Sequence, residues 1–367
     1  MEDVGVSQAF WKGKRVLLTG HTGFKGSWMS LWLQHMGAQL TGLALEPPTR
    51  PNLFEEARVA GGMRSVTCDI RDLAGVTRVF QDAQPEIVIH MAAQPLVRRS
   101  YAQPVETYAT NVLGTVHVLE AVRLTPGVRT LVNVTTDKCY ENREWAWGYR
   151  EDDALGGADP YSNSKACAEL VTAAYRASFL CPRAAGERAV AVATARAGNV
   201  IGGGDWAQDR LVPDVLRAFE EGRVVQLRNP LATRPWQHVL EPLAGYLLLA
   251  QRLHEQGQPF AQAWNFGPSE AGAQSVQWIV EQMARRWGAG AHWQAAQGVH
   301  PHEAMSLKLD TSKARNLLGW RPVWGLGHAL DLIVDWAAAR RQGADVRALT
   351  LQQIASHEHD SEHIGDE

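Results

Sequence analysis

No stretch of this sequence approaches the ~20 consecutive apolar residues that a membrane-spanning helix requires. The first residues, Met-Glu-Asp, carry no apolar signal core, so we expect a soluble, cytoplasmic protein without a membrane partner. Cysteine is scarce and shows neither Cys-x-x-Cys spacing nor a regular period, which favours reduced thiols over a disulfide framework. The four cysteines are Cys68, Cys139, Cys167 and Cys181.

An excess of one charge is absent as well. There are 36 Lys and Arg residues against 39 Asp and Glu residues, the formal net charge is −3, and no long basic block occurs. We therefore expect no nucleic-acid partner held by bulk electrostatic attraction. The chain does have 367 residues with 45% hydrophobic content, which is enough for a large core and suggests about two domains.

Strand and helix patterns alternate from residue 14 to residue 196. This alternation predicts an α/β fold, a Rossmann-type doubly wound parallel sheet. We expect a cofactor-binding domain at 1–197, to which a segment near 237–265 returns, and a smaller α/β substrate-binding domain mainly at 198–350. The polar segment 351–367 is expected to be a flexible, solvated tail, and its three histidines are not taken as a metal site. The expected strands are 14–19, 39–45, 65–68, 86–90, 129–134 and 190–196.

The first expected strand leads into a glycine-rich turn that is followed by an amphipathic helix to about Met36. Glycines at such a turn allow a sharp bend, a close approach of the backbone to a pyrophosphate and tight contact between helix and strand. The spacing is G-x-x-G-x-x-G, one residue wider than the usual fingerprint. The candidate cofactor-binding residues in this turn are Gly20, Thr22, Gly23, Phe24, Lys25 and Gly26.

The next strand ends of the sequence offer further cofactor contacts. Glu46 lies where an acidic group would bond the adenosine ribose, which favours NAD, whereas Arg50 would instead suit the 2′-phosphate of NADP. Asp69 and Ile70 follow the third strand and are candidates for holding adenine; a surface-loop carboxylate is the plainer alternative for Asp69. After the fourth strand, small residues would let a dinucleotide lie against the backbone, and a helical asparagine would shape the same site. These residues are Ala92, Ala93, Gln94 and Asn111.

Tyr161 and Lys165 lie four residues apart on a helix that is expected to begin at Asp159-Pro160, an N-cap followed by proline in the first turn. An ammonium near a phenol favours the phenolate; lowering its pKa from ~10 to ~7 requires about 4 kcal/mol. Tyr-x-x-x-Lys also occurs by chance in many helices. Here, however, Thr136, Asp137 and Lys138 stand at the carboxyl end of the strand 129–134, where open α/β sheets place their sites.

Together these motifs resemble the extended short-chain dehydrogenase/reductase family. Within it, residues 136–145 (Thr-Asp-Lys-Cys-Tyr-Glu-Asn-Arg-Glu-Trp) are similar to the CDP-glucose 4,6-dehydratase branch, and related dehydratases commonly carry Asp-Glu in place of Asp-Lys. The resemblance covers roughly residues 10 to 340. Its further motifs are Gly148-Tyr149-Arg150-Glu151, residues 198–206 (Gly-Asn-Val-Ile-Gly-Gly-Gly-Asp-Trp) and residues 234–239 (Arg-Pro-Trp-Gln-His-Val).

The resemblance implies a lyase that acts on CDP-glucose with NAD in deoxysugar biosynthesis. Tyr161 would deprotonate the sugar 4-hydroxyl while C4 is oxidised, Lys165 would hold the nicotinamide ribose, and Thr136 would bond the same hydroxyl. Lys138 would then remove the C5 proton and Asp137 would protonate the leaving 6-hydroxyl. Return of the hydride to C6 would give a 4-keto-6-deoxy sugar.

These roles place two demands on ionisation. Lys138 must be neutral although the free pKa of lysine is ~10.4, and Asp137 must be protonated, so its pKa must rise. Proton sharing between the adjacent pair would meet both demands. An ordinary surface ion pair is the alternative for Asp137 and Lys138.

Substrate contacts are expected from Asn199, Arg210, Arg234 and His302. Arginine forks match diphosphate oxygens, although a solvent-facing salt bridge is an equal alternative for either arginine, and a structural histidine for His302. The family resemblance also implies a homodimer joined through the helices at 104–123 and 161–179.

Three functional classes remain after this reading. They are a 4,6-dehydratase, a nucleotide-sugar 4-epimerase that uses the tyrosine but no elimination, and a non-catalytic nucleotide-binding protein. Asp137 and Lys138 favour the first over the second, and Tyr161 with Lys165 argues against the third. The fold alone cannot choose among them.

Overall fold

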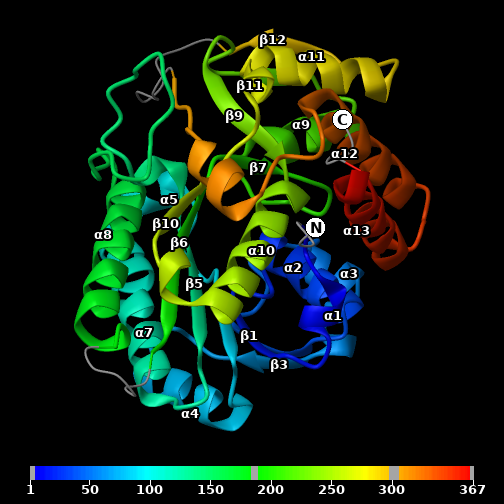
Figure 1. Ribbon diagram of the computed structural model, residues 1–367. Helices are drawn as coiled ribbons and strands as arrows, with labels where there is room; N and C mark the ends of the chain where they lie inside the picture. Colours follow the sequence, from blue (N-terminus) through cyan, green and yellow to red (C-terminus); the bar gives the residue numbers. More distant parts are fainter. Residues whose placement is uncertain (1–4, 183–188, 297–305, 364–367) are drawn as a thin grey trace.

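Figure 1 shows two lobes in the computed structural model, which describes residues 5–182, 189–296 and 306–363. The larger lobe is built on a seven-stranded sheet in the order β10-β6-β5-β4-β1-β2-β3, and every strand pairing in it is parallel. The predicted doubly wound sheet is therefore confirmed. Its strands are β1 Arg15–Thr19, β2 Gln39–Ala44, β3 Arg64–Thr67, β4 Ile87–His90, β5 Thr130–Val134, β6 Ala191–Ala197 and β10 Ala263–Phe266.

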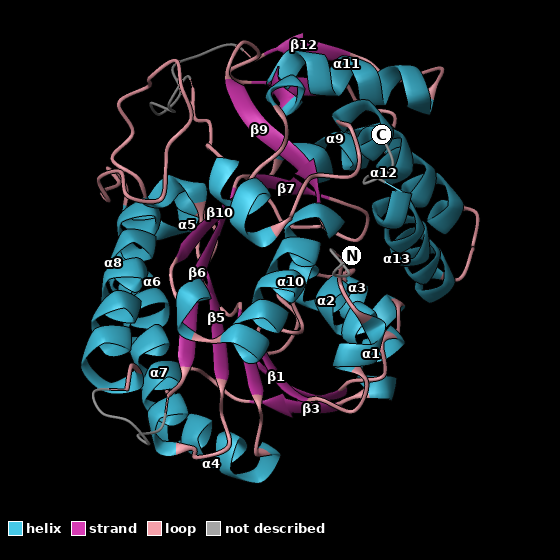
Figure 2. Cartoon of the chain, in the orientation of Figure 1, coloured by secondary structure: helices cyan, strands magenta, loops and turns pink. Residues whose placement is uncertain are grey.

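Both faces of this sheet are covered by helices, as Figure 2 shows. On β1, Val16 and Leu18 face one apolar core and Leu17 faces the other, which follows from the two-residue period of a strand. The first core packs α2 (Phe24–His35) and α10 (Leu240–Gln256), and the second packs α4 (Leu73–Ala83) and α7 (Gly114–Leu124). Burial on both faces explains why the central strands β1 and β4 are mostly continuous apolar runs rather than alternating ones.

Two of the predicted helices contain a π-helical turn. The segment predicted at 104–123 consists of α6 (Pro104–Tyr108), a π turn (Ala109–Leu113) and α7, and the segment predicted at 161–179 is α8 (Pro160–Tyr175) followed by a π turn (Arg176–Leu180). Such turns are frequent at functional sites, and the first one contains Asn111. The remaining short helices of this lobe are α1 Gln8–Trp11, α3 Leu53–Glu56 and α5 Val97–Ala102.

The smaller lobe begins where the chain leaves β6. It holds a three-stranded sheet in the order β11-β9-β7, a strand pair β12-β8, and a third apolar core between them and their helices. The chain then returns to the first lobe through α10 and β10, so β10 becomes the edge strand beside β6. The elements of this lobe are β7 Asn199–Ile201, α9 Leu211–Glu220, β8 Val225–Leu227, β9 Thr233–His238, β11 Ala273–Ser275, α11 Val276–Trp287, β12 Trp293–Ala295 and α12 Leu326–Arg341.

The prediction of a flexible tail from residue 351 is wrong for residues 351–363. They belong to α13 (Val346–His363), which packs on α2 and is the red helix of Figure 1. Ile354 and His357 are buried there, and the indole N–H of Trp32 donates a 2.6 Å hydrogen bond to Glu358. Polar residues of α13 thus pair with tryptophans far away in the sequence, which a composition argument cannot detect.

The described residues lack a helix that could span a membrane, a cluster of metal ligands and a disulfide bond. None of their helices combines the length and apolar character needed to cross a membrane. They include no cluster of three His, Cys, Asp or Glu side chains able to hold a metal ion. All four cysteines are free thiols.

Candidate active site

The site lies at the carboxyl ends of β1 and β4, where the strand order of the sheet reverses. Open α/β sheets bind their ligands in the crevice at this point. Gly20 follows β1 with a φ of +79°, and a Cβ on it would lie 2.8 Å from the backbone nitrogen of Ala92, which follows β4. Only glycine allows the two strand ends to approach each other this closely.

The glycine-rich turn fits a pyrophosphate. A Cβ on Gly26 would lie 2.0 Å from the Gly20 carbonyl oxygen, so Gly26 is required by the packing of α2 on the turn. Gly23 is different, because a Cβ there would meet only that oxygen at 3.4 Å. The backbone at Gly23, the N-cap of α2, is therefore open to a ligand at the positive end of the helix dipole.

Three side chains of the turn have separate surroundings. Thr22 donates a 2.8 Å hydrogen bond to the Leu45 carbonyl oxygen and so ties the turn to the end of β2. Phe24 packs toward Gly202 of the smaller lobe. Lys25 is half-buried, and burial followed by the charges of Arg210 and Lys165 lowers its pKa to about 7.

The side chains proposed for adenosine lie around the ends of β2 and β3. Glu46 accepts a 3.0 Å hydrogen bond from Thr67 at the end of β3. Asp69 is held by the guanidinium of Arg71, whose hydrogen bond lowers the pKa of the carboxyl. Ile70 is buried against Gly114 of α7, so it belongs to the core as well as to the wall of the crevice.

Asn111 is buried and fixes the segment after β4. Its side-chain oxygen accepts a 2.8 Å hydrogen bond from the Gln94 backbone nitrogen, and its amide donates to the Gln94 carbonyl oxygen at 3.0 Å and to Ser164 at 2.9 Å. The small-residue turn at Ala92 and Ala93 is thereby joined to α8. Asn111 therefore shapes the loop that follows β4.

The predicted start of the helix that carries Tyr161 and Lys165 is confirmed. Asp159 caps α8 by accepting a 2.9 Å hydrogen bond from the Ser162 backbone nitrogen, and Pro160 is its first residue. Lys165 donates a 3.2 Å hydrogen bond to the Val134 carbonyl oxygen at the end of β5. Burial lowers the pKa of Lys165 to about 8, against the opposing charge of Glu169.

The pKa of Tyr161 differs from the expectation. Burial raises it to about 12, and a hydrogen bond with Thr136 only partly opposes this rise. Desolvation of the phenolate therefore outweighs the cations around it, and Lys165 is directed to the Val134 carbonyl oxygen. What sequence spacing predicted was proximity on one helix face; the depth of burial is a tertiary property.

Thr136, Asp137 and Lys138 form the first turn after β5. The Thr136 hydroxyl donates a 3.0 Å hydrogen bond to Asp137 Oδ1, while Asp137 Oδ2 is buried without a hydrogen-bond partner among the described residues. Burial raises the pKa of Asp137, against the opposing charge of Lys138, so the carboxyl is kept closer to its protonated form. The half-buried Lys138 lies at the edge of this group.

The structure describes three of the four candidate substrate residues, and the charges of two of them affect other candidate site residues. Arg210 is paired with Asp205 at 2.8 Å, and its charge lowers the pKa of Tyr161, while that of Arg234 lowers the pKa of Asp137. The charge of each arginine therefore reaches one of the candidate catalytic side chains. Asn199 begins β7 and is half-buried. His302 lies outside the described residues.

Sequence reasoning did not identify Tyr246, which lies on α10. It is completely buried, and its hydroxyl has no hydrogen-bond partner in the described part of the chain. Burial and the charges of Asp137 and Tyr161 raise its pKa, which places it near these two candidate catalytic residues. No sequence signal distinguishes this tyrosine from the other apolar-face residues of its helix.

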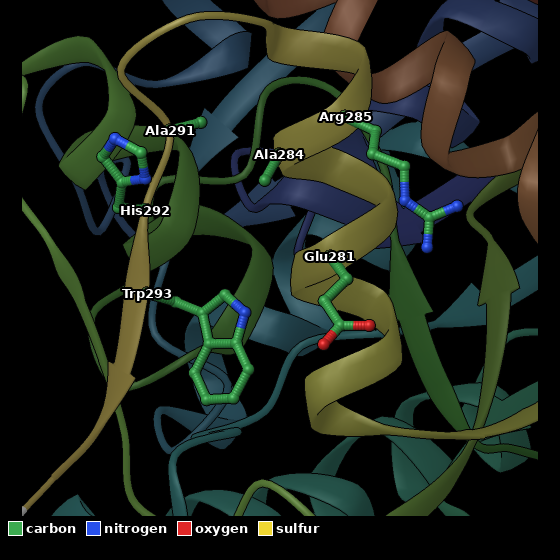
Figure 3. A pocket seen from close by; sticks show the side chains of 6 residues that line it. All are labelled: Glu281, Ala284, Arg285, Ala291, His292 and Trp293. Carbon is green, nitrogen blue, oxygen red and sulfur yellow. The ribbon is translucent and has the colours of Figure 1, made fainter.

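A surface cavity of about 320 Å³ lies elsewhere, between α11 and the segment that leads into β12 (Figure 3). None of the candidate site residues lines it. Its lining residues are Glu281, Ala284, Arg285, Ala291, His292 and Trp293.

The strand ends of the seven-stranded sheet, together with α8, carry a glycine-rich turn, a tyrosine with a lysine one helical turn further along, and an acid followed by a second lysine. The glycine-rich turn and the tyrosine–lysine pair are the features that resemble the extended short-chain dehydrogenases/reductases. The sequence profile described as GDP-mannose 4,6 dehydratase matches residues 17–331, and the chain belongs to this family.

Two curated relatives show how specific the likeness is. The CDP-glucose 4,6-dehydratase of Salmonella typhimurium is 54% identical over 352 residues, which cover 96% of this chain and 98% of that protein. The dTDP-glucose 4,6-dehydratase of Streptomyces antibioticus is 27% identical, covering 88% of this chain and 91% of that protein.

Solved structures share the fold. MoeE5 in complex with UDP-glucose and NAD is 24% identical, with a TM-score of 0.74 over 90% of this chain and 100% of that one. The UDP-glucose 4-epimerase of Thermus thermophilus in complex with NAD is 25% identical, with a TM-score of 0.75 over 88% of this chain and 98% of that one.

Proposed function

We propose that this protein converts CDP-glucose to CDP-4-keto-6-deoxyglucose and water. The observation that carries the proposal is that the turn with Asp137 and Lys138 follows β5, to whose end Lys165 is bonded, and that Tyr161 is hydrogen-bonded to Thr136 of the same turn. A tyrosine with a lysine is sufficient for oxidation and reduction at C4, whereas elimination of water needs an additional acid and base. Extensive identity with the Salmonella typhimurium CDP-glucose 4,6-dehydratase supports the same sugar nucleotide.

The first step uses the face of α8. Tyr161, ionised to the phenolate, accepts the proton of the sugar 4-hydroxyl, and Thr136, whose hydrogen bond opposes the rise in the pKa of Tyr161 that burial causes, orients the sugar hydroxyl. Lys165 remains a cation below its pKa of about 8 and stabilises the phenolate form of Tyr161, which becomes a phenol when it takes this proton. When bound, NAD would be the redox partner for the oxidation at C4 and for the later reduction at C6.

The second step uses the turn after β5. The 4-ketone acidifies the proton on C5, which Lys138 removes, and the leaving 6-hydroxyl takes its proton from Asp137. The raised pKa of Asp137 supports this direction of transfer, because a buried carboxyl holds its proton nearer to neutral pH. One proton leaves C5 and one joins O6, so a single water is lost.

We propose NAD as the cofactor because of the groups that surround Glu46. Its carboxylate is held by Thr67 between the ends of β2 and β3, where an acceptor for ribose hydroxyls is needed. The backbone at Gly23 would hold the pyrophosphate, and Lys165 the nicotinamide ribose. Solved structures of fold relatives are described as NAD complexes. The other proposed contacts are Gly20, Thr22, Phe24, Lys25, Gly26, Asp69, Ile70, Ala92, Ala93, Gln94 and Asn111.

Substrate contacts remain predictions for Asn199, Arg210, Arg234 and His302. The effects of Arg210 on the pKa of Tyr161 and of Arg234 on that of Asp137 support a diphosphate or sugar position between the two lobes. A guanidinium fork in each case matches phosphate oxygens.

A homodimer is proposed through the α6–α7 and α8 helices. Large apolar side chains are exposed along them, and Val105 is 82% exposed, more than an isolated monomer surface favours. Figure 1 shows α7 and α8 side by side on one flank, so two copies would form a four-helix interface. The other exposed apolar residues there are Leu113, Leu124, Leu170 and Phe179.

The decisive experiment incubates the purified protein with NAD⁺ and, separately, with CDP-, dTDP-, GDP- and UDP-glucose, followed by mass spectrometry. Loss of one water from CDP-glucose alone is the expected result. Water loss from another donor would correct the nucleotide. An unchanged mass with an inverted C4 would instead indicate a 4-epimerase, and no reaction with any donor would refute the proposed dehydratase.

A further inference from the structure

Helix α8 is bonded to the end of β5 at two successive residues. Lys165 donates a 3.2 Å hydrogen bond to the Val134 carbonyl oxygen, and one turn further along the helix Glu169 accepts a hydrogen bond from the Thr135 hydroxyl. The next residue is Thr136, where the catalytic turn begins. The two halves of the proposed machinery come from different elements, and these bonds join them directly.

Glu169 is almost completely buried. Besides Thr135, it accepts hydrogen bonds from the Thr194 hydroxyl at 2.6 Å and from the Arg196 guanidinium at 2.8 Å, and the side chains of this ion pair are only 3% and 4% exposed. Burial alone would raise the pKa of Glu169, but the charge of Arg196 and these hydrogen bonds lower it. The carboxylate is therefore held as an anion one turn from Lys165.

Arg196 extends the network to the far side of the catalytic turn. Its guanidinium donates to the Tyr140 hydroxyl at 2.8 Å and to the Glu151 carbonyl oxygen at 2.9 Å. The Tyr140 hydroxyl in turn donates to Asn265 on β10 at 2.7 Å. Residues 136–138 are thus fixed on one side by Thr135 and on the other by Tyr140, and both residues bond to the same buried ion pair.

A buried ion pair contributes little net stability, because desolvation of the two charges offsets their attraction. The positions of its hydrogen-bond partners on both sides of the turn explain the presence of this ion pair better than its contribution to stability does. We propose that Glu169, together with Arg196, is a positioning residue that holds Tyr161 and Lys165 of α8 in register with the turn at 136–138. The inference rests on the proposed function, since the register serves a reaction that needs both elements at once.

Glu169 also acts on the charge of Lys165. Burial lowers the pKa of Lys165 to about 8, and the carboxylate of Glu169 opposes that decrease. Other groups facing Lys165 add little negative charge. They are the Cys139 thiol after β5, whose pKa is raised by burial; His90 on β4, whose pKa is lowered to about 3 by burial; and Lys25 on α2.

The test compares four variants with the wild type in turnover and thermal unfolding. Glu169→Gln removes the charge and keeps the shape. The double variant Glu169→Leu/Arg196→Met replaces the pair by apolar side chains, a change that is commonly neutral or stabilising for a buried pair. Glu169→Asp keeps the charge. Asp335→Asn breaks an exposed bidentate pair with Arg286 on α11 and serves as the matched control.

We expect the double variant to unfold near the wild-type temperature but to have a kcat about 100-fold lower, the cost of a small misplacement of reacting groups. KM should change little, and Asp335→Asn should behave as wild type. If the double variant recovers both the wild-type melting temperature and kcat, the pair is only structural and the inference is overturned. Glu169→Asp should retain more activity than Glu169→Gln; equal losses would also contradict it.

A second readout needs no turnover. The acetylation rate of Lys165, followed by peptide mass spectrometry against pH, reports when its amine becomes neutral. We expect the midpoint to shift to lower pH in Glu169→Gln and to stay in place in Asp335→Asn. An unchanged midpoint in Glu169→Gln would overturn the role of Glu169. Absence of turnover in the wild type would refute the proposed function, and this labelling would still decide about Glu169.

Discussion

The Thr136 hydroxyl donates a 3.0 Å hydrogen bond to one oxygen of Asp137, while the other oxygen is buried without a partner among the described residues. Ionisation of a buried carboxyl group is costly when only one of its two oxygens has a hydrogen-bond partner. This agrees with the raised pKa of Asp137, which is caused mainly by burial. The function proposed for Asp137 and the stability of the fold therefore make opposite demands on this side chain.

Asp137→Asn should stabilise the protein and inactivate it. Because the folded state raises the pKa of Asp137, ionisation penalises folding as the pH rises above the unfolded value of 3.8, and the penalty is complete above the folded pKa. The variant should therefore melt higher than the wild type near pH 8 and the difference should shrink toward pH 3. Dehydration should fall by about 10²–10⁴-fold. A lower melting temperature at pH 8 would show that the ionised carboxylate stabilises the fold.

Lys138→Met should stop water loss without unfolding the protein. Lys138 is only half-buried, so the methionine has room, while removal of a general base costs about 10²–10⁴ in rate. Mass spectrometry of the CDP-glucose reaction measures the loss. Lys308→Met is the control, because the Lys308 side chain donates to the Ala146 carbonyl oxygen at 3.3 Å and Lys308 is not one of the candidate site residues. Near-normal turnover in Lys138→Met would exclude Lys138 as the base.

Tyr161→Phe should block the step that precedes elimination. The hydroxyl is the only part removed, so KM for CDP-glucose should stay close to the wild-type value and kcat should decrease by about 10³-fold or more. Tyr175→Phe, at the other end of α8, is the matched control and should keep full activity. Unchanged turnover in the first variant would dismiss Tyr161 from the mechanism.

Charge placed on the exposed face of α8 should dissociate the proposed dimer. Leu170→Glu adds a carboxylate to a side chain that is 57% exposed in the single chain. In a two-fold interface the two new charges would be desolvated near each other, and light scattering should report monomer. Leu231→Glu, at a position 71% exposed in the smaller lobe, should leave the mass unchanged. A monomeric wild type would remove the dimer proposal altogether.

Helix α13 should contribute to global stability. Ile354 is fully buried between α13 and the first core, so Ile354→Ala should lower the free energy of unfolding by about 2–5 kcal/mol. Gln352→Ala, on the exposed side of the same helix, is the control and should change it by less than about 0.5 kcal/mol. Denaturant unfolding measures both. Equal stabilities for the two variants would mean that the helix docks weakly.

Local patterns in the sequence were sufficient to predict the parallel sheet, the glycine-rich turn and the residue at which α8 begins. Buried parallel strands are continuous apolar runs, glycines mark positions without room for a Cβ, and Asp159-Pro160 signals a helix start through its own backbone. Such signals depend on neighbouring residues only. They also place Tyr161 and Lys165 on one helix face before any tertiary contact is known.

Tertiary structure alone decided the depth of burial and the long-range pairs. The pKa of Tyr161 rises to about 12 because the completed fold desolvates the phenol, and no spacing predicts that. Glu169 finds Arg196, and Trp32 finds Glu358 across most of the chain, because packing brings distant elements together. The sequence by itself thus determined which groups lie at the strand ends. The tertiary structure determined the protonation of these groups, their partners, and the packing of the last segment as an ordered helix.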